Sequence, residues 1–586
     1  MGIATLLLQQ GLISRSQVDA AVAEQRRSGE RLDRVLVRLG LVKREQVLAV
    51  IGDQFQMPVV DLAAITPEAS ILATLPPKLV HKQSCVPIAR REGVLTVATC
   101  DPFELSMLDE LKLLTGCSIE VVLADEEDLR GFIAKHYGVG SDTLDALSAG
   151  LEGAPASGDR RLDDPEQAEE ASVIKLVSDL LADAIADRAT DVHIEPYERE
   201  LVVRSRIDGV LQRANVPATI HRFAPAIISR LKIMANLNVA EKRVPQDGRI
   251  TFRTSAGAGG GVGNAPTESH GATVEYDLRV SVIPMLFGEG VVLRVLSKSA
   301  VMLGLDQLGM PPGVQADWDA LIQRPHGILL VTGPTGSGKS TTLYASLNRI
   351  VSQEIKAITV EDPVEYHVPG VNQIQVNHKV GLDFAAGLRS ILRHDPDVVL
   401  VGEIRDKETA ETAVQASLTG HLVFSTLHTN DAAGATTRLL NMGVEPFLVS
   451  SSVEGIMAQR LVRRVCEQCA AVLSAEDVAA IKPQDLPEGF LRKGESLAGA
   501  GMRLVRAAPA GCRACRTTGY RGRVGIYELL RMSDDLREMV IERAPAPRIA
   551  ASARQSGLLA TLREDGFTKA RAGTTTLEEV LRAIAM

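Results

Sequence analysis

The sequence predicts an α/β protein of several domains, one of which is built on a mostly parallel sheet. Its 586 residues are too many for a single core at about 150 residues per domain. After Leu305 the pattern runs strand, Gly-rich turn, helix, strand, helix, strand, which is typical of parallel strands covered by helices. From Leu144 to Glu170 the chain is rich in Gly, Ala, Ser, Pro, Asp and Glu and lacks hydrophobic periodicity, so a linker separates an N-terminal module from the rest.

The N-terminal module, residues 1–140, begins with an internal repeat whose period is 29 residues. Each copy predicts a short helix, a Gly-containing turn and a second helix that begins near Ser14 or Lys43. Residues 85–135 then predict a small α/β unit. The matching positions of the repeat are Gly11, Val18, Val22 and Gln25 in the first copy and Gly40, Val47, Ile51 and Gln54 in the second.

A flexible linker is predicted at residues 141–171, and a second domain of the α+β type at residues 172–302. An apolar stripe that begins at Ile174 predicts the first helix of this domain. The low-complexity segment Thr254–Gly271 predicts a surface loop. The strands of the domain are predicted at Leu201–Arg206, Leu278–Ile283 and Val291–Leu296.

The strongest signal in the remaining domain, residues 303–586, is a Gly-rich loop between a strand and a helix. The apolar strand Gly327–Val331 leads into Gly-x-x-x-x-Gly-Lys-Ser, and the helix Ser340–Ile350 follows. Glycines let backbone N–H groups approach phosphates, the helix N-terminus favours negative charge, Lys339 supplies a cation and Ser340 holds Mg²⁺. We therefore predict ATP and Mg²⁺ as ligands, with contacts from Gly333, Pro334, Thr335, Gly336, Ser337, Gly338, Lys339, Ser340 and Thr341.

Two more apolar strands of this domain end in carboxylates. Ala357–Val360 is followed by Glu361, and Val398–Val401 leads to Glu403. The carboxyl ends of parallel strands gather at the sheet edge that carries the Gly-rich loop, so both carboxylates are predicted to meet the phosphates. One is expected to orient or deprotonate the attacking water, and the other to hold Mg²⁺ through water.

Four of the seven cysteines form two Cys-x-x-Cys pairs that are separated by 42 residues. In a chain without an export signal this pattern favours a metal over disulfides. We predict one tetrahedral Zn²⁺ site in a subdomain at residues 462–522, followed by C-terminal helices within residues 530–586. A redox pair and cysteines without a joint role are the alternatives. The predicted zinc ligands are Cys466, Cys469, Cys512 and Cys515.

Composition and charge argue against other classes of protein. Aromatic residues make up 3% of the chain and the formal net charge is −9, which disfavours nucleic-acid binding. No run approaches the roughly 18 apolar residues that span a bilayer. The start of the chain lacks the basic segment of a signal peptide. We therefore expect a cytoplasmic protein that binds no nucleic acid.

Three longer motifs follow the Gly-rich loop: ITVEDPVE at residues 358–365, LRSILRHDPDVVLVGEIRD at 388–406 and TGHLVFSTLHTN at 419–430. With the loop, they resemble the acidic, Walker B and histidine boxes of the ATPases that assemble type II secretion pseudopili and type IV pili. The resemblance implies a RecA-like domain that hydrolyses ATP within a homo-hexamer. It assigns Glu361 as the catalytic carboxylate, Glu403 as the Walker B residue, and His421 and His428 as reporters of the γ-phosphate.

The resemblance also assigns roles to four arginines. Arg279 and Arg294, on predicted strands of the second domain, are expected to reach the γ-phosphate as arginine fingers. Arg389 and Arg393 are expected to serve the nucleotide or the contact between subunits. Without the resemblance, a single arginine on a strand is more often a charge that faces solvent. Likewise, two histidines seven residues apart, such as His421 and His428, more often have structural roles.

The N-terminal repeat resembles a module of the same ATPases that in some members binds cyclic di-GMP through an Arg-Leu-Gly start in each copy. Here the copies start with Gly-Ile-Ala at residue 2 and Arg-Leu-Asp at residue 31. These departures argue against dinucleotide binding. The module is instead expected to dock to an inner-membrane platform protein, which would hold the chain peripherally at the inner membrane.

The function predicted from these features is a motor that hydrolyses ATP to drive type II secretion. Ser417–His421 and Met442–Ser452 look closer to secretion ATPases than to pilus-extension ATPases. The alternatives are a type IV pilus extension ATPase, a non-hydrolysing nucleotide-gated scaffold and a nucleic-acid translocase.

Overall fold

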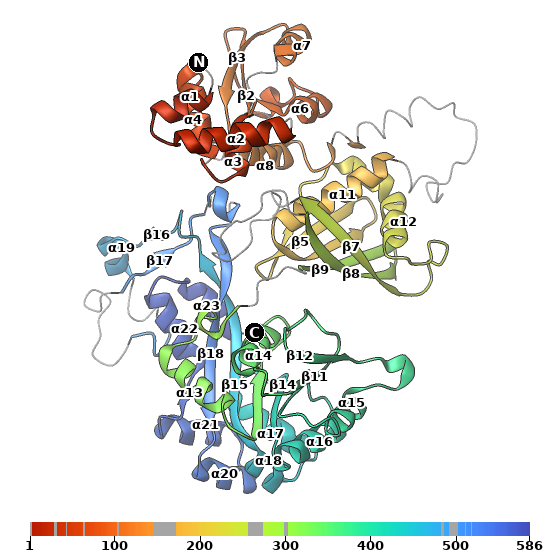
Figure 1. Cartoon of the computed structure of the whole chain (residues 1–586), viewed down its shortest axis with the longest axis vertical. Helices are drawn as coiled ribbons and strands as arrows, with labels where there is room; N and C mark the ends of the chain where they lie inside the picture. The colour runs from red at the N-terminus through yellow and green to blue at the C-terminus, as the bar shows by residue number, and fades with distance from the viewer. Residues whose placement is uncertain are drawn as a thin grey trace. The chain divides into compact units, whose positions relative to one another are not determined.

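The computed structural model describes residues 3–585, except for 29–31, 43, 63–64, 102–104, 142, 145–170, 256–272, 298–302, 482–485, 492–501, 510 and 517. The chain divides into two compact units, Met1–Ser299 and Ala300–Met586. Figure 1 shows their helices and strands. The predicted α/β, multidomain fold class is confirmed.

Four helices at the start of the first unit follow the 29-residue repeat. Each copy is a helix, a turn and a second helix, and the second helices begin at Arg15 and Arg44, as the repeat predicts. Gly11 and Gly40 occupy equivalent turns with φ values of 71° and 66°, a region that glycine adopts readily. The helices are α1 (Ile3–Gln9), α2 (Arg15–Ser28), α3 (Leu32–Arg38) and α4 (Arg44–Phe55).

A three-stranded sheet comes next in the first unit. Strand β2 pairs antiparallel with β1 and parallel with β3, and the helix between β2 and β3 makes the parallel crossover. The elements are α5 (Ala69–Leu72), α6 (Pro77–Gln83), β1 (Cys85–Arg91), β2 (Val94–Thr99), α7 (Leu105–Thr115), β3 (Ser118–Leu123) and α8 (Glu126–His136).

The predicted α+β domain forms the rest of the first unit. Its six strands pair antiparallel in the order β6-β5-β4-β9-β8-β7, and α11 and α12 contribute to their hydrophobic core. Its elements are α11 (Ala171–Ala186), β4 (Ala189–Pro196), β5 (Leu201–Ile207), β6 (Val210–Arg213), α12 (Ala224–Met234), β7 (Gln246–Ser255), β8 (Thr273–Met285) and β9 (Gly288–Ser297).

Most of the predicted linker and of the predicted surface loop lies outside the described residues. At the edge of the linker, Ser141, Thr143 and Leu144 are helical and buried, so the ordered chain continues past residue 140. Leu144 belongs to the hydrophobic core of the α+β domain.

The second unit is built on an eight-stranded sheet in the order β12-β11-β13-β14-β10-β15-β18-β19. The first six of these strands are parallel, and the last two pairings are antiparallel. The strands are β10 (Gly327–Thr332), β11 (Ala357–Glu361), β12 (Val371–Gln375), β13 (Val398–Val401), β14 (Leu422–Leu427), β15 (Val453–Val465), β18 (Tyr520–Arg531) and β19 (Leu559–Ala560).

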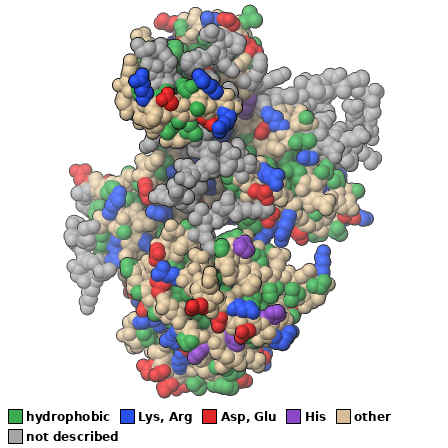
Figure 2. All heavy atoms as spheres, viewed as in Figure 1, with side chains coloured by type: hydrophobic (Ala, Val, Ile, Leu, Met, Phe, Trp, Pro, Cys, Tyr) green, Lys and Arg blue, Asp and Glu red, His purple; other side chains and the backbone are tan. Residues whose placement is uncertain are grey.

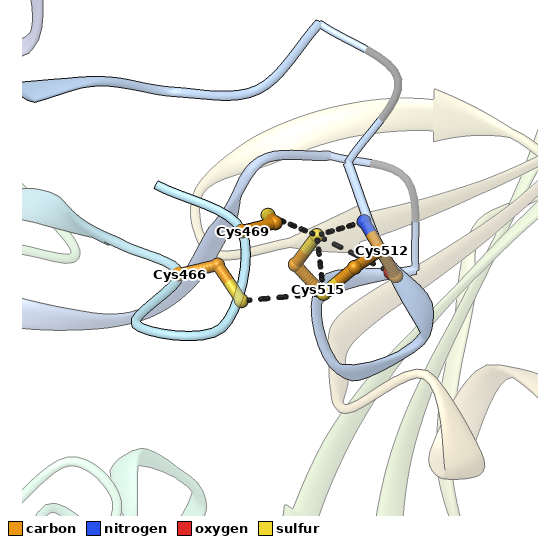
Figure 3. Close-up of side chains that lie close together, drawn as sticks. All are labelled: Cys466, Cys469, Cys512 and Cys515. Carbon is orange, nitrogen blue, oxygen red and sulfur yellow. Dashed lines mark hydrogen bonds between the residues drawn. The ribbon is translucent and has the colours of Figure 1, made fainter. Parts of the chain in front are cut away.

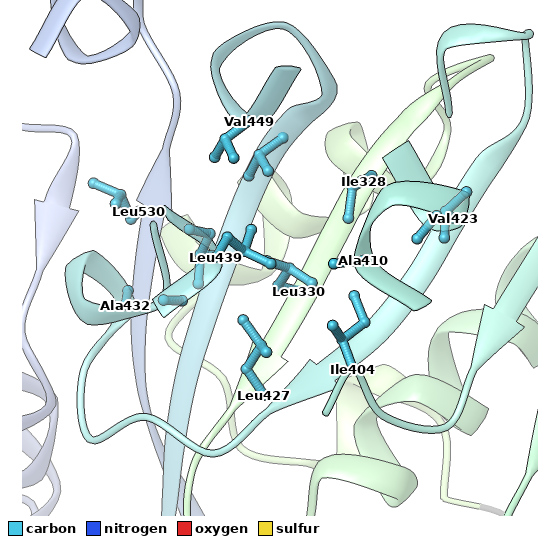
Figure 4. Packing of buried hydrophobic residues seen from close by; sticks show 14 of the residues in the cluster. Ile328, Leu330, Ile404, Ala410, Val423, Leu427, Ala432, Leu439, Val449 and Leu530 are labelled. Carbon is cyan, nitrogen blue, oxygen red and sulfur yellow. The ribbon is translucent and has the colours of Figure 1, made fainter. Parts of the chain in front are cut away.

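Helices cover both faces of this sheet, because successive residues of a strand point to opposite faces. Leu329 and Val331 pack with residues of α13 and α14, whereas Ile328 and Leu330 pack with residues of α16 and α17 (Figure 4). The helices are α13 (Pro312–Ile322), α14 (Lys339–Ile350), α15 (Phe384–Ile391), α16 (Lys407–Leu418), α17 (Ala432–Asn441), α18 (Pro446–Ser452), α20 (Asp534–Ile541), α21 (Ala546–Gln555), α22 (Leu562–Arg571) and α23 (Leu577–Ala585).

Aspartates begin three of the helices that follow the carboxyl ends of strands. The side chains of Asp383, Asp406 and Asp431 each accept a hydrogen bond from the backbone N–H three residues later, at 2.6–2.8 Å. Such N-caps satisfy backbone donors that have no partner within the helix. They fix where each connection leaves the sheet edge that carries the Gly-rich loop.

Two further expectations from the sequence concern nucleic-acid binding and membrane-spanning segments. Figure 2 shows acidic and basic side chains interspersed over the visible face of each unit. Among the described residues, no helix combines the length and the apolar character that crossing a membrane requires.

Candidate functional site

The Gly-rich loop joins the end of β10 to the start of α14. Gly336 and Gly338 adopt φ values of 80° and 90°, where a side chain would be strained. A Cβ atom at Gly333 would lie 2.6 Å from the backbone oxygen of Gln459, so only glycine fits. Because α14 begins at Lys339, the N–H groups of its first turn lack carbonyl partners within the helix and are free to bind an anion.

Lys339 lies over this loop. Its Nζ donates hydrogen bonds to the backbone oxygens of Gly333 and Pro334, at 2.9 and 3.1 Å. Burial lowers the pKa of Lys339 to about 8; the negative charge of Glu403 opposes this shift and Arg460 adds to it. A phosphate bound at the loop would therefore find a cation already in place at neutral pH.

Glu403 follows the carboxyl end of β13, and its side chain is largely buried. His428 Nε2 lies 3.1 Å from one carboxylate oxygen, and Arg405 Nη2 lies 2.5 Å from the other. Burial acts to raise the pKa of Glu403, but the hydrogen bonds and charges of Arg405 and His428 outweigh it and hold the pKa below its usual value. Glu403 is thus an ionised carboxylate at the edge of the sheet that carries Lys339.

Glu361 lies at the carboxyl end of β11, but its carboxylate is enclosed. Tyr344, on α14, donates its hydroxyl to Oε2, and the Thr359 hydroxyl donates to Oε1 at 2.5 Å. Gln373 also donates to Oε1, at 3.2 Å. The structure therefore encloses the Glu361 carboxylate beneath α14, within a set of three donors.

The structure separates the two histidines of the histidine box. His428 follows the carboxyl end of β14, where Thr429 Oγ1 contacts Thr332 Oγ1 of β10 at 2.7 Å. His421 precedes the same strand, and its Nδ1 lies 2.8 Å from the backbone oxygen of Ala416. Since a strand rises about 3.3 Å per residue, the two histidines lie roughly 20 Å apart along β14. His421 is therefore not at the phosphate end of the sheet in its own chain.

Arg389 and Arg393 do not contact the Gly-rich loop within the described residues. Arg389, on α15, forms an ion pair with Glu408 at the start of α16. Arg393 donates to the backbone oxygen of Arg389 at 2.8 Å. Both side chains are exposed. Both arginines therefore lie on the surface of the described part of the second unit.

Arg279 and Arg294 are direct neighbours in the first unit. Arg279 of β8 is paired in register with Arg294 of β9 on one side and with Arg249 of β7 on the other. Directly opposite side chains share a face of the sheet, and like charges there are unfavourable. Asp191 of β4 compensates Arg294 at 3.4 Å. Arg249 thus extends the predicted pair to a row of three arginines.

Gln459 of β15 supports the Gly-rich loop, and its neighbour Arg460 holds the segment after β14, although no motif indicated either residue. The buried side chain of Gln459 donates to the backbone oxygen of Ser337 and accepts from the hydroxyl of Thr342, both at 2.8 Å. Arg460, also buried, donates to the backbone oxygen of Asn430 at 2.9 Å. Both residues lie on β15, the strand that pairs with β10. The sequence does not specify that these two strands pair, so it gave no usable signal for these residues.

The four predicted zinc ligands meet in one cluster (Figure 3), with their sulfur atoms all within 4.8 Å of one another. Three of the Sγ–Sγ distances are 3.6, 3.7 and 3.8 Å. A tetrahedron with Zn–S bonds of about 2.3 Å has edges of about 3.8 Å, so the cluster fits Zn²⁺. Backbone N–H groups of Cys512 and Gly519 donate to Cys515 Sγ, which favours the thiolate that a metal needs.

The chain is similar to two groups of curated proteins over almost its whole length. It is 41% identical to the type IV pilus assembly ATPase PilB of Myxococcus xanthus, over 98% of this chain and 97% of that protein. It is 40% identical to the type II secretion system protein E of Xanthomonas campestris, over 99% and 98%. The family model described as type II/IV secretion system protein matches residues 166–582, and the MshEN domain matches residues 55–143.

A solved structure aligns with much of the chain. The X-ray structure of the Legionella pneumophila ATPase DotB covers 74% of this chain and 98% of its own, with a TM-score of 0.47 and 18% identity.

Proposed function

The chain belongs to the type II/IV secretion system protein family, and we propose that it is the motor of a type II secretion system. It is an ATP hydrolase that uses Mg²⁺, and its cysteine cluster suits Zn²⁺. We infer that hydrolysis drives assembly of a pseudopilus and thereby protein export. The observation that carries the proposal is the Gly-rich loop between β10 and α14, with Lys339 held over it and the ionised Glu403 following the carboxyl end of β13 in the same sheet.

Each residue of the site has a separate proposed role in hydrolysis. Backbone N–H groups at the start of α14 and the Lys339 ammonium bind the phosphates, and Ser340 together with Glu403 holds the metal. Mg²⁺, when bound, neutralises charge that develops on the transferred phosphoryl group. His428 and Arg405 keep Glu403 ionised and oriented. Glu361 is proposed as the carboxylate that orients the attacking water.

The remaining assignments concern the assembled motor. A ring of six chains is proposed, with Arg389 of α15 and Arg393, two residues after the end of α15, at the contact between subunits; both side chains are exposed. Arg279 and Arg294, now joined by Arg249, are proposed to bind the γ-phosphate. The N-terminal module is proposed to dock to an inner-membrane platform protein and to hold the motor peripherally at that membrane.

A type IV pilus extension ATPase is the second candidate. It is favoured by the 41% identity to the pilus assembly ATPase of Myxococcus xanthus over 98% of this chain. Deleting the gene separates the candidates, because a secretion motor is needed for export of secreted enzymes and a pilus motor for surface pili. Loss of pili with intact export would replace the first proposal by the second.

The enzymatic core of the proposal is tested by phosphate release from the purified chain, alone and with cytoplasmic domains of candidate platform proteins. We expect Glu403→Gln to lower turnover by about 100-fold or more while ATP still binds. The matched control is Glu542→Gln, an exposed carboxylate that follows α20 and lies 4.0 Å from Arg548. Equal loss in both variants, or turnover in Glu403→Gln at the wild-type rate, would contradict the assignment.

A further inference from the structure

The carboxylate of Glu361 is one of the most completely hydrogen-bonded side chains of the second unit. It is 5% exposed, and its donors come from three elements. Thr359 lies on the same strand and the same face, Gln373 lies on the neighbouring strand β12, and Tyr344 comes from α14, which covers that face of the sheet. A carboxylate held from three directions has one fixed orientation.

The hydrogen bonds leave one acceptor position on this carboxylate. Each carboxylate oxygen accepts about two hydrogen bonds. Oε1 already receives two, from Thr359 and Gln373, whereas Oε2 receives one, from Tyr344. A water molecule that Glu361 activates must therefore donate to Oε2, beside the Tyr344 hydroxyl. The direction of that remaining lone pair is set by where Tyr344 lies.

Tyr344 is well placed to set this direction because it belongs to the helix that binds the phosphates. It lies five residues after Lys339 on α14 and is 1% exposed. Its hydroxyl also accepts a hydrogen bond from the backbone N–H of Glu365, at 3.3 Å. Its ring meets the ring of Tyr366 edge to face, with 4.6 Å between centroids. One side chain thus connects the Gly-rich loop to the acidic segment that follows β11.

We propose that Tyr344 is a positioning residue for ATP hydrolysis: its hydroxyl orients Glu361 Oε2 toward the attacking water and fixes that carboxylate relative to the phosphate-binding helix α14. The proposal rests on the proposed role of Glu361 as the carboxylate that orients water. It adds a residue outside the four motifs, and it links Glu361 of β11 to the helix that begins at Lys339, because Tyr344 lies on that helix.

The test compares Tyr344→Phe with Tyr366→Phe. Tyr344→Phe keeps the ring and removes one donor to Glu361, whereas Tyr366→Phe removes a hydroxyl outside the set of donors. We expect Tyr344→Phe to lower kcat by about tenfold, the value of one hydrogen bond to a charged group, with the KM for ATP and the affinity for a non-hydrolysable ATP analogue unchanged. Tyr366→Phe should keep wild-type values.

The split between kcat and KM separates positioning from a packing effect. A loss of packing around Tyr344 would loosen α14 and raise the KM for ATP, whereas the loss of one donor to Glu361 should lower kcat alone.

Three results would overturn the proposal, and they are distinguishable. Wild-type kcat in Tyr344→Phe would show that the hydroxyl has no positioning role. Loss of analogue binding together with kcat would make Tyr344 part of the folding of the Gly-rich loop. Turnover retained in Glu361→Gln would remove Glu361 from the reaction, and would then contradict the proposed function of that residue and not only the role of Tyr344.

Discussion

Lys339 shows at the residue scale how the fold prepares a charge for a ligand. Its pKa is about 8 rather than 10.5, first because it is buried; Glu403 opposes that shift and Arg460 adds to it. Bound phosphates would add negative charge and raise this pKa. Below about pH 8 the free protein already carries the proton, and above it the proton must be taken up on binding.

The prediction is that ATP binding is coupled to proton uptake only above about pH 8. There the affinity for a non-hydrolysable ATP analogue should fall by up to about tenfold per pH unit, whereas it should be nearly constant between pH 7 and 7.5. Titration calorimetry at pH 7 and pH 9, in buffers of different ionisation enthalpy, measures the protons directly. Lys339→Gln should bind weakly without this pH dependence; the same uptake in that variant would point to another group.

Single residues also show where the sequence was sufficient. The Gly-rich loop and the four cysteines were predictable because their chemistry is local. His421 was assigned to the phosphates by resemblance, yet a six-residue strand separates it from His428, and that strand alone indicated opposite ends of the sheet. The enclosure of Glu361 was not predictable, because it depends on Tyr344 reaching it from a separate helix.

At the element scale, β15 connects two sites that are distant in the sequence. Gln459 holds the Gly-rich loop through Ser337 and Thr342. Seven residues later, Cys466 belongs to the cysteine cluster. The strand also pairs over most of its length with β18, which starts five residues after Cys515. Local sequence patterns predict strands, but which strands lie side by side is decided only in the folded sheet. Gln459 was missed because it reaches the Gly-rich loop only when β15 lies next to β10.

Replacing Gln459 should weaken both the fold and ATP binding. Gln459→Met keeps the volume but leaves the Ser337 carbonyl and the Thr342 hydroxyl without their partner, which costs about 1–3 kcal/mol of unfolding free energy. The matched control is Met457→Leu, two residues earlier on the same buried face. Both variants should unfold at lower denaturant concentration, but only Gln459→Met should bind the ATP analogue less tightly. Equal affinities in the two variants would show that Gln459 only fills space.

The cysteine cluster makes a second prediction at this scale. Cys469→Ser removes one of four sulfur ligands, and we expect bound zinc to fall from about one ion per chain to less than about a tenth of that. Cys100→Ser changes a cysteine outside the cluster and should retain the metal. Elemental analysis gives the zinc content, and hydrogen exchange should show lost protection in Val505–Arg506 and at the start of β18. Full zinc in Cys469→Ser would contradict the four-sulfur site.

At the scale of the whole molecule, the two units contribute different chemistry. The second unit holds the loop, Lys339 and Glu403, and the first unit holds the row Arg249, Arg279 and Arg294. Three adjacent guanidinium groups gather positive charge on one sheet face; Asp191 offsets part of it at Arg294, and a bound anion would offset more. The sequence indicated two of these arginines through resemblance. Arg249 was missed because it is distant from Arg279 in the sequence. Only the register of β7 against β8 brings the two residues together.

The arginine row therefore predicts a separation of stability from activity. Arg279→Ala removes the middle charge together with the interactions that this guanidinium makes, so the unfolding free energy of the chain should fall only modestly, by about 1 kcal/mol or less. Hydrolysis should fall by about 100-fold or more if the row stabilises negative charge on the transferred phosphoryl group. Arg253→Ala is the matched control, since Arg253 lies on the same face of β7 and pairs with Glu275 at 3.2 Å. It should lose a little stability and no activity. Destabilisation of Arg279→Ala with normal hydrolysis would make the row structural, and the anion would have to be bound by the second unit alone.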